Sequence, residues 1–236
     1  MLSWQPVEFC GTAMIVVHHL NKSRSQRILW LLEELGLDYE IKKYQRDPKT
    51  MLAPPELKAV HPLGKSPVIS DGDTVVAESG AIVEYLVQRY GNGRLVPPAD
   101  SPERLRWTYF LHFAEGSAMP PLLLKLIFDR IEHGPMPFFA RPIARAIARK
   151  VKSDFILPNI RSQLDYLESE LNKSTWFAGE EFTAADIQMS FALEASSSRG
   201  GLDGKYPKLS AFLERIHARP AYQRALERGG KYELAK

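Results

Sequence analysis

Two serines at the start of a predicted helix are the first candidates for a reactive or anion-binding site. The segment Leu20–Ser25 joins a predicted strand to this helix and carries the hydroxyls of Ser23 and Ser25. Free backbone N–H groups and the positive end of the helix dipole favour an anion at a helix N-terminus. A serine in this position also caps a helix, and the local pattern alone favours this simpler role over anion binding.

A proline-containing segment, His61–Ile69, provides a second candidate site. A residue before proline is held in extended backbone, so Ser66 can present its N–H and C=O groups to an extended ligand. Because only about 5–6% of X–Pro bonds are cis, the spacing alone predicts a trans bond between Ser66 and Pro67. Lys65 precedes this pair and adds a positive charge.

The segment Val76–Ile82 runs from the end of a predicted strand into a helix. With Ser79 as the helix N-cap and Glu78 before it, a hydroxyl, free N–H groups and a carboxylate meet at one place. This combination suits an amino-acid head group, with its carboxylate at the helix end and its ammonium on Glu78. An ordinary capped helix is the simpler interpretation of the same residues.

A fourth segment, Trp176–Asp186, carries a folding signal. Thr183 and Asp186 have the [ST]-x-x-[DE] spacing of a capping box, in which each side chain accepts a hydrogen bond from the backbone of the other residue. We therefore predict that Thr183 and Asp186 start a helix and stabilise the fold, and that neither takes part in chemistry.

The sequence does not indicate other kinds of reactive site. It contains no H-E-x-x-H, G-x-S-x-G or G-x-x-x-x-G-K-[ST] motif. His18 and His19 are neighbours in a predicted strand, so their side chains point to opposite faces and cannot share a metal ion. The single cysteine, Cys10, excludes an intramolecular disulfide and a cysteine-rich metal site. We therefore expect no metal site.

The pattern of predicted strands and helices that position these segments changes near residue 92. Before it, strand-like and helix-like patterns alternate in the order β-α-β-α-β-β-α, and Gly36 stands where a glycine commonly ends a helix. The predicted strands are Met14–His19, Tyr39–Tyr44, Pro67–Ser70 and Thr74–Val76, and the predicted helices include Ser25–Leu35 and Ser79–Tyr90.

Beyond residue 92 the strand signals stop, and the fold class is therefore α/β followed by all-α. The helical patterns are Pro102–Phe128, Pro142–Leu171, Thr183–Ser197 and Pro207–Gly229. We expect four parts, which are an N-terminal extension at 1–13, an α/β domain at 14–93, a proline-containing linker at 94–102 and an all-helical domain at 103–236. Met14 would serve as an alternative start.

The composition is that of an ordinary globular protein and limits its location and partners. Of the 236 residues, 44% are hydrophobic and 25% are charged. The net charge of +3 is too small by itself to imply nucleic-acid binding. No apolar run approaches the ~18–20 residues that span a bilayer, and the first residues lack the pattern of a secretory signal. We expect a soluble cytoplasmic protein without nucleic-acid binding or stable membrane insertion.

The stretch 132–152 is unusually basic. Arginines recur every four residues from Arg141 to Arg149 and so share one helical face, beside an apolar stripe that includes Ile143 and Ile147. The pattern favours a solvated basic face above a packed apolar stripe. A helix that lies on a membrane surface is the alternative.

Taken together and in this order, the four segments resemble the cytosolic glutathione transferases, and in particular bacterial members with a serine-type site. The matching pieces are S-R-S-Q-R-I-L-W-L-L-E-E-L-G, H-P-L-G-K-S-P-V-I, the E-S pair of V-A-E-S-G-A-I-V-E-Y-L, and F-T-A-A-D-I. The likeness extends from Met14 to about Gly229. It implies a thioredoxin-like N-terminal domain followed by an all-helical C-terminal bundle, usually in a homodimer.

The resemblance also assigns glutathione-binding roles. Ser66 and Pro67 match the dipeptide at a cis-proline whose backbone pairs with the cysteinyl part of glutathione. Glu78 and Ser79 match the pair that holds the γ-glutamyl group. Lys65 matches a basic position that reaches the glycyl carboxylate, although a solvated surface charge is an equal alternative.

The implied activity is conjugation of glutathione to small hydrophobic electrophiles, as in detoxification, or reduction of organic peroxides. Ser23 matches the serine that activates the glutathione sulfur, and Ser25 is the alternative two positions on. The electrophile would lie in an apolar pocket between the domains, with the helix Trp107–Phe113 as a candidate wall. Glutathione is the co-substrate, and no metal or organic redox cofactor is required. A non-catalytic binding or regulatory module of the same fold is the alternative function.

Overall fold

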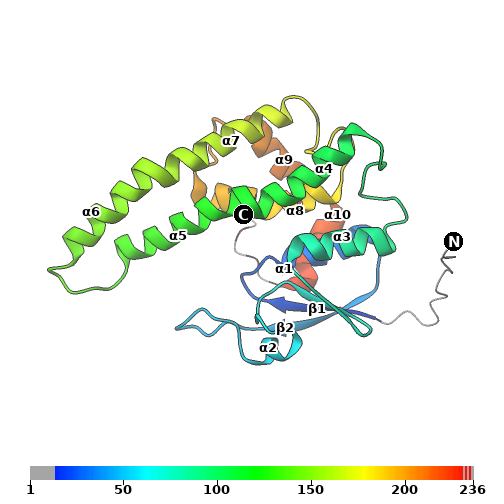
Figure 1. The fold of residues 1–236 in the computed structure, drawn as a ribbon, viewed down its shortest axis with the longest axis horizontal. Coiled ribbons are helices and arrows are strands. Elements are labelled where there is room, and N and C mark those ends of the chain that lie inside the picture. The colour runs from blue at the N-terminus through cyan, green and yellow to red at the C-terminus, as the bar shows by residue number, and fades with distance from the viewer. Residues whose placement is uncertain (1–13, 231, 233, 235–236) are drawn as a thin grey trace, which may run out of the picture.

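The structure is a computed structural model that describes residues 14–230 together with 232 and 234. The expected extension, 1–13, and Cys10 within it lie outside the described residues. A small sheet with its helices occupies the chain up to residue 90, and helices follow from residue 102 (Figure 1). This arrangement confirms the predicted fold class.

Four strands form the mixed sheet, in the order β2-β1-β3-β4. β1 pairs in parallel with β2 and antiparallel with β3, and β3 pairs antiparallel with β4. Each strand begins and ends within one residue of its predicted bounds. The strands are β1 (Ile15–Leu20), β2 (Tyr39–Tyr44), β3 (Val68–Asp71) and β4 (Thr74–Ala77).

Three helices flank the sheet: α1 (Ser25–Leu35), α2 (Glu56–Val60) and α3 (Ser79–Tyr90). α1 and α3 lie on the side of the sheet that faces the helical part, and α2 lies on the other side (Figure 1). The predicted bounds of α1 are confirmed. Its apolar stripe is buried, and Gly36 ends the helix at φ +69°, in the left-handed region that glycine adopts at little steric cost.

The helical part begins with α4, and short π-helical segments connect several of its helices. The segments Ala114–Ala118 and Lys152–Ile156 join α4 to α5 and α6 to α7, so that each pair forms one long, uneven helix. The helices are α4 (Pro102–Phe113), α5 (Met119–His133), α6 (Arg141–Val151), α7 (Leu157–Leu171), α8 (Ala184–Ala195), α9 (Pro207–His217) and α10 (Pro220–Gly229).

The predicted helix Pro207–Gly229 is wrong as a single element. It divides into α9 and α10 because Arg219 precedes Pro220 and takes an extended backbone with ψ 131°. A residue before proline is driven out of the helical region by the proline ring. Pro220 then starts α10, where the missing N–H group costs nothing.

α1 connects the sheet to the helical part. It packs against α3, α8 and α10, and its Glu33 and Glu34 pair with arginines of α10 and the residue before it. The Glu34 carboxylate is 2.6 Å from the Arg219 guanidinium, and the Glu33 carboxylate is 2.8 Å from that of Arg224. These ion pairs hold the C-terminal end of α1 against the helical part, and the helix contacts both parts of the protein.

The predicted capping box is confirmed at the start of α8. The Asp186 carboxylate accepts hydrogen bonds from the backbone N–H groups of Phe177 and Thr183, at 2.9 and 2.8 Å. Asp186 is fully buried, and burial raises its pKa to about 6 against the opposing effect of these hydrogen bonds. The pair ties the preceding loop to α8.

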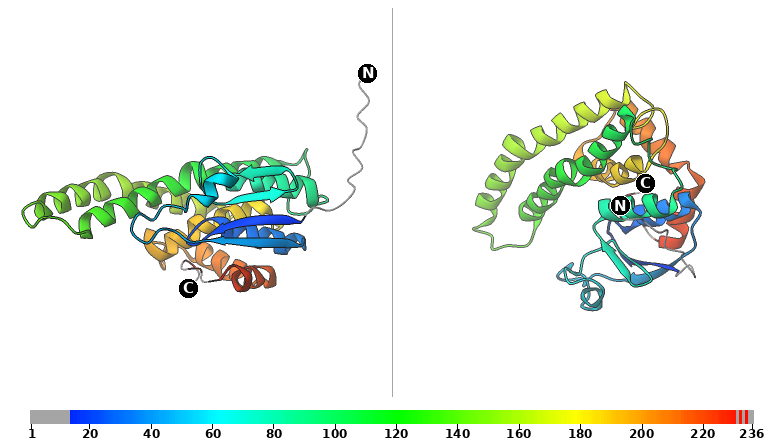
Figure 2. Two further views of the ribbon diagram at one scale, coloured as in Figure 1. Left: turned by 90° about the horizontal axis from the view of Figure 1, so that it is seen from below. Right: turned by 45° about the vertical axis from the view of Figure 1, so that its right-hand side comes forward.

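The apolar stripe of α6 is exposed, which corrects the expectation of a packed stripe. Ile143 is 65% exposed and Ile147 is 54% exposed, since α5 and α6 form a hairpin that extends beyond the rest of the molecule (Figure 2). Arg149 on the same helix pairs with Glu132 of α5 at 2.7 Å. Within the described residues, no helix has the length and apolar character needed to cross a membrane.

Candidate functional site

Ser23 lies in the loop between β1 and α1 and is nearly buried, with 6% of its surface exposed. Its hydroxyl oxygen is 2.7 Å from that of Ser25 and 3.2 Å from that of Ser66. The N-cap of α1 is Arg24, and Ser25 is the first helical residue. Neither serine is therefore the N-cap that the local pattern favoured, although Ser23 accepts a hydrogen bond from the Ser25 backbone.

Ser25 is fully buried and connects Ser23 to His19. Its hydroxyl oxygen is 2.9 Å from the Nδ1 atom of His19. Burial, followed by the charge of Lys43, lowers the pKa of His19 to about 4, so the imidazole is neutral near pH 7. His18 points to the other face of β1 and contacts Tyr44, as expected for neighbours in a strand.

The bond between Ser66 and Pro67 is cis, so the trans bond predicted from spacing alone is wrong and the cis bond implied by the resemblance is confirmed. The Ser66 hydroxyl donates to the carbonyl oxygen of His18 at 3.0 Å and accepts from the N–H group of Leu20 at 3.4 Å. These contacts fix the segment before β3 against the end of β1. They join residues nearly 50 positions apart, which local spacing does not encode.

Glu78 and Ser79 stand at the start of α3, displaced by one residue from the predicted cap. Glu78 is the N-cap and has φ +71°, while Ser79 is the first helical residue. The Glu78 side chain is exposed. Ser79 is buried, and its hydroxyl accepts a hydrogen bond from Arg27 at 2.9 Å. An exposed carboxylate and a helix N-terminus therefore lie side by side.

A partly buried ion pair supports this helix end, and the sequence analysis missed it. Arg27, only 2% exposed, places its guanidinium 2.6 Å from the Glu115 carboxylate, and Arg24 approaches the same carboxylate at 3.0 Å. Burial would raise the pKa of Glu115, but these two positive charges hold it below its usual value. The position of Arg27, one residue before Ile28 on the apolar side of α1, is the sequence signal that could have revealed it.

Five of the predicted site residues line one cavity of about 320 Å³: Lys65, Ser66, Pro67, Glu78 and Ser79. Arg24 and Glu115 line it as well. Ser23 adjoins this cavity through its 3.2 Å contact with Ser66. Among the residues that the structure describes, no group of three or more His, Cys, Asp or Glu side chains could hold a metal ion.

The aromatic helix segment Trp107–Phe113, a candidate wall of the electrophile pocket, does not line this cavity. Trp107 and Phe110 of α4 are buried in the core. A second cavity, of about 410 Å³, adjoins the first at Arg24 and is lined by the next helix, α5, through Met119 and Leu122. No residue of Trp107–Phe113 lines either of these two cavities.

The two parts of the chain match two family models. Residues 12–88 match the N-terminal domain of glutathione S-transferase, and residues 141–220 match its C-terminal domain. The chain belongs to the glutathione S-transferase family. It is 34% identical to glutathione S-transferase 1 of Saccharomyces cerevisiae, with 91% of this chain and 95% of the yeast protein covered.

Two further relatives support membership of the glutathione S-transferase family. Glutathione S-transferase 3 of Schizosaccharomyces pombe is 37% identical, with 91% of this chain and 88% of that protein covered. The crystal structure of a glutathione S-transferase from Actinobacillus pleuropneumoniae is 36% identical and superposes with a TM-score of 0.78, covering 94% of this chain and 96% of that one.

Proposed function

We propose that this protein is a glutathione transferase in which the Ser23 hydroxyl activates the glutathione thiol for transfer to small electrophiles. The observation that carries the proposal is the 3.2 Å approach of Ser23 to Ser66, because Ser66 lines the cavity that also contains Glu78 and Ser79. A tripeptide that lies in this cavity with its cysteinyl part on Ser66 brings its sulfur to Ser23.

The polar groups of the cavity suit the three parts of glutathione. The γ-glutamyl ammonium pairs with the exposed carboxylate of Glu78, and the γ-glutamyl carboxylate lies at the N-terminus of α3 beside Ser79. The extended backbone of Ser66 pairs with the cysteinyl part as an added strand would. Lys65, at the exposed side of the cavity, attracts the glycyl carboxylate.

The hydrogen bonds around Ser23 support donation from its hydroxyl to the sulfur. A serine hydroxyl has one hydrogen, and Ser66 already donates its own to the carbonyl of His18. When neutral His19 donates from Nδ1 to Ser25, Ser25 donates in turn to Ser23. The single hydrogen of Ser23 then points to the Ser66 oxygen, which lines the cavity, and a thiolate bound there is a stronger acceptor to which this hydrogen can turn. The aligned donors strengthen one another.

The size of the effect follows from the energy of one hydrogen bond to an anion. A free thiol has a pKa of about 8.5, and the thiolate is the attacking species. A hydrogen bond to a charged group contributes roughly 1.5–3 kcal/mol, which corresponds to a decrease of about 1–2 units in the thiol pKa. The bound thiolate then attacks the electrophilic carbon, the leaving group departs with the bonding electrons, and the thiol proton passes to solvent.

Calorimetric titration with glutathione and a turnover assay with an aryl halide and an organic hydroperoxide test the proposal. Glutathione binding with turnover of the aryl halide supports conjugation, and turnover of the hydroperoxide adds peroxidase activity. Binding without turnover of either substrate overturns the transferase activity in favour of a non-catalytic module. Absence of binding overturns the glutathione site itself.

We further propose that the protein is a cytoplasmic homodimer that detoxifies electrophiles. Exposed apolar side chains on the helical part support self-association, because exposed apolar surface commonly marks protein–protein contacts. Leu105 on α4 is 75% exposed, and Ile127 on α5 is 43% exposed.

A further inference from the structure

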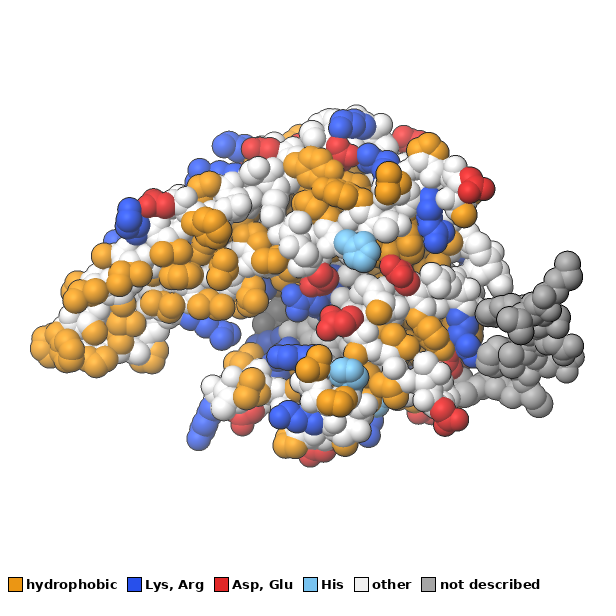
Figure 3. All heavy atoms as spheres, in the orientation of Figure 1, with side chains coloured by type: hydrophobic (Ala, Val, Ile, Leu, Met, Phe, Trp, Pro, Cys, Tyr) orange, Lys and Arg blue, Asp and Glu red, His pale blue; other side chains and the backbone are white. Residues whose placement is uncertain are grey.

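The cavity that adjoins the proposed glutathione site is lined by basic side chains from separate elements. They are Lys22 and Arg24 beside Ser23, Arg46 after β2, Arg130 on α5 and Arg199 after α8. Figure 3 shows the hollow between the α5–α6 hairpin and the sheet part, with basic side chains at its rim. Four separate segments of the chain thus direct positive charge at one space of about 410 Å³.

Among the described residues that line this cavity, none is an aspartate or glutamate that would balance its four arginines. Arg24 pairs with Glu115, which lies in the other cavity. Arg46 donates to the carbonyl oxygens of Asn21 and Met51, at 3.1 and 2.9 Å, and neutral acceptors leave its positive charge in place. Burial, and then the charge of Arg24, lower the pKa of Arg46.

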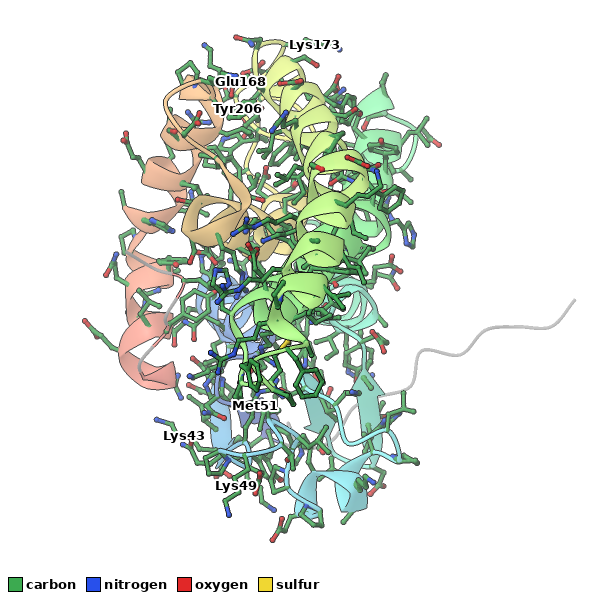
Figure 4. All side chains as sticks on the ribbon, turned by 90° about the vertical axis from the view of Figure 1, so that its left-hand side faces the viewer. Lys43, Lys49, Met51, Glu168, Lys173 and Tyr206 are labelled. Carbon is green, nitrogen blue, oxygen red and sulfur yellow. The ribbon has the colours of Figure 1, made fainter. Side chains whose placement is uncertain are left out.

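Apart from Tyr232, the other described lining residues are apolar. α5 contributes Met119 and Leu122, α8 contributes Phe191, and the loop after β2 contributes Met51. Figure 4 shows Met51 at the end of the sheet part that faces the α5–α6 hairpin, with Lys43 and Lys49 farther out. A ligand that fits this space therefore has an apolar body and at least one negative charge.

We propose that this cavity, as the electrophile pocket of the proposed transferase, selects electrophiles bearing a carboxylate or sulfonate on an apolar skeleton. The inference rests on the proposed function, because Ser23 lies between Lys22 and Arg24 and the thiolate would form there. A neutral electrophile gains only the apolar contacts. An anionic one also gains hydrogen bonds to charged guanidinium groups, which favour it by about 10–100-fold in kcat/KM.

Two aryl chlorides of the same reaction type provide the test. 1-Chloro-2,4-dinitrobenzene is neutral, and 4-chloro-3,5-dinitrobenzoate carries a carboxylate. In both, a carbon–sulfur bond forms to glutathione, the carbon–chlorine bond breaks, chloride leaves with the electron pair, and the thiol proton passes to solvent. The kcat/KM for each compound is divided by its uncatalysed rate constant with glutathione, and the ratio of the two results measures the preference for the anion.

The parent protein should prefer the benzoate by about tenfold or more, and salt should reduce this preference. The double substitution Arg130→Gln and Arg199→Gln should bring the ratio close to one. Arg161→Gln, which removes an exposed charge on α7 outside the cavity, is the matched control and should leave the ratio unchanged. Because the ratio cancels a general loss of active protein, partial misfolding does not affect it.

A ratio near one in the parent, or an unchanged ratio in the double variant, would overturn the inference. If the arginines served glutathione instead, the double variant would raise the KM for glutathione with both electrophiles and leave the ratio unchanged. If glutathione binds but neither compound turns over, the affinities of the two S-aryl glutathione products decide by the same comparison. Failure to bind glutathione would overturn the proposed function, and the inference with it.

Discussion

Replacing Ser23 by alanine removes the hydroxyl that the proposed mechanism directs at the sulfur. Glutathione should still bind with nearly the parent affinity, because the groups that hold the tripeptide are Glu78, Ser79 and the backbone of Ser66. The lost hydrogen bond to the thiolate contributes roughly 1.5–3 kcal/mol, so the pKa of the bound thiol should rise by about 1–2 units. Turnover near neutral pH should then fall by about 10–100-fold.

The assay is the pH dependence of kcat in parent and variant at saturating glutathione. In Ser23→Ala the rising limb of the profile should move to higher pH, and raising the pH should recover part of the lost rate because thiolate forms without the hydroxyl. In the arrangement in which His19 donates to Ser25, Ser25→Ala removes a donor to Ser23 and not a contact with the sulfur, so its profile should move in the same direction by a smaller amount.

A purely structural role of Ser23 predicts a different result. If Ser23 only supports the start of α1, through its contact with the Ser25 backbone, Ser23→Ala should lower the melting temperature and leave the pH profile unchanged. An unchanged profile in both serine variants would refute the serine mechanism and assign thiol activation to other groups at this helix end.

Four further results are expected. Glu78→Gln should weaken glutathione binding by about 1–3 kcal/mol in calorimetry, and an affinity equal to the parent's would remove Glu78 from the γ-glutamyl site. Asp186→Ala should lower the melting temperature, at a cost of about 0.5–2 kcal/mol, while turnover per folded molecule stays constant; a large loss of turnover in folded protein would contradict a purely structural role. The pKa of His19 is about 4 in the folded protein, below the unfolded value of about 6.5. Its contribution to stability is therefore present above pH ~6.5 and is lost as the pH falls towards 4. His19→Gln should flatten the decline of melting temperature over that pH range. Sedimentation at micromolar concentration should give about twice the 26.7 kDa chain mass, whereas a monomer would contradict the homodimer.

Local patterns predicted the elements well where neighbouring residues decide the structure. The apolar period of α1 and the glycine after it define that helix completely, and the capping box at Thr183 does the same for the start of α8. The division between α9 and α10 was also present in the sequence, as a proline inside an otherwise helical pattern, but its effect on Arg219 was overlooked.

The remaining features depend on contacts between distant parts of the chain. The partly buried pair of Arg27 and Glu115 joins residues 88 positions apart, and no spacing rule connects them. The cis bond at Pro67 was implied by the resemblance and not by the local pattern. The exposure of Ile143 could not be predicted, because a helical stripe shows which face is apolar but not whether another element covers it.

The candidate site also combines residues that local motifs indicate with contacts that only the fold creates. Sequence motifs named Ser23, Ser66 and Glu78 separately, whereas only the folded chain brings Ser66 to Ser23 and places Ser66 in one cavity with Glu78. The link from Ser25 to His19 also follows from the fold, since β1 and α1 must meet at the correct angle to form it.

The proposed mechanism requires that the bound glutathione thiol is more acidic than the free thiol. The most direct measurement is the ultraviolet absorbance of the thiolate in the complex of protein and glutathione, titrated against pH and corrected for free protein and free glutathione. If Ser23 donates to the thiolate, the titration midpoint should lie about 1–2 units below the free-thiol value of about 8.5. A bound thiol that titrates at the free-thiol value would contradict it.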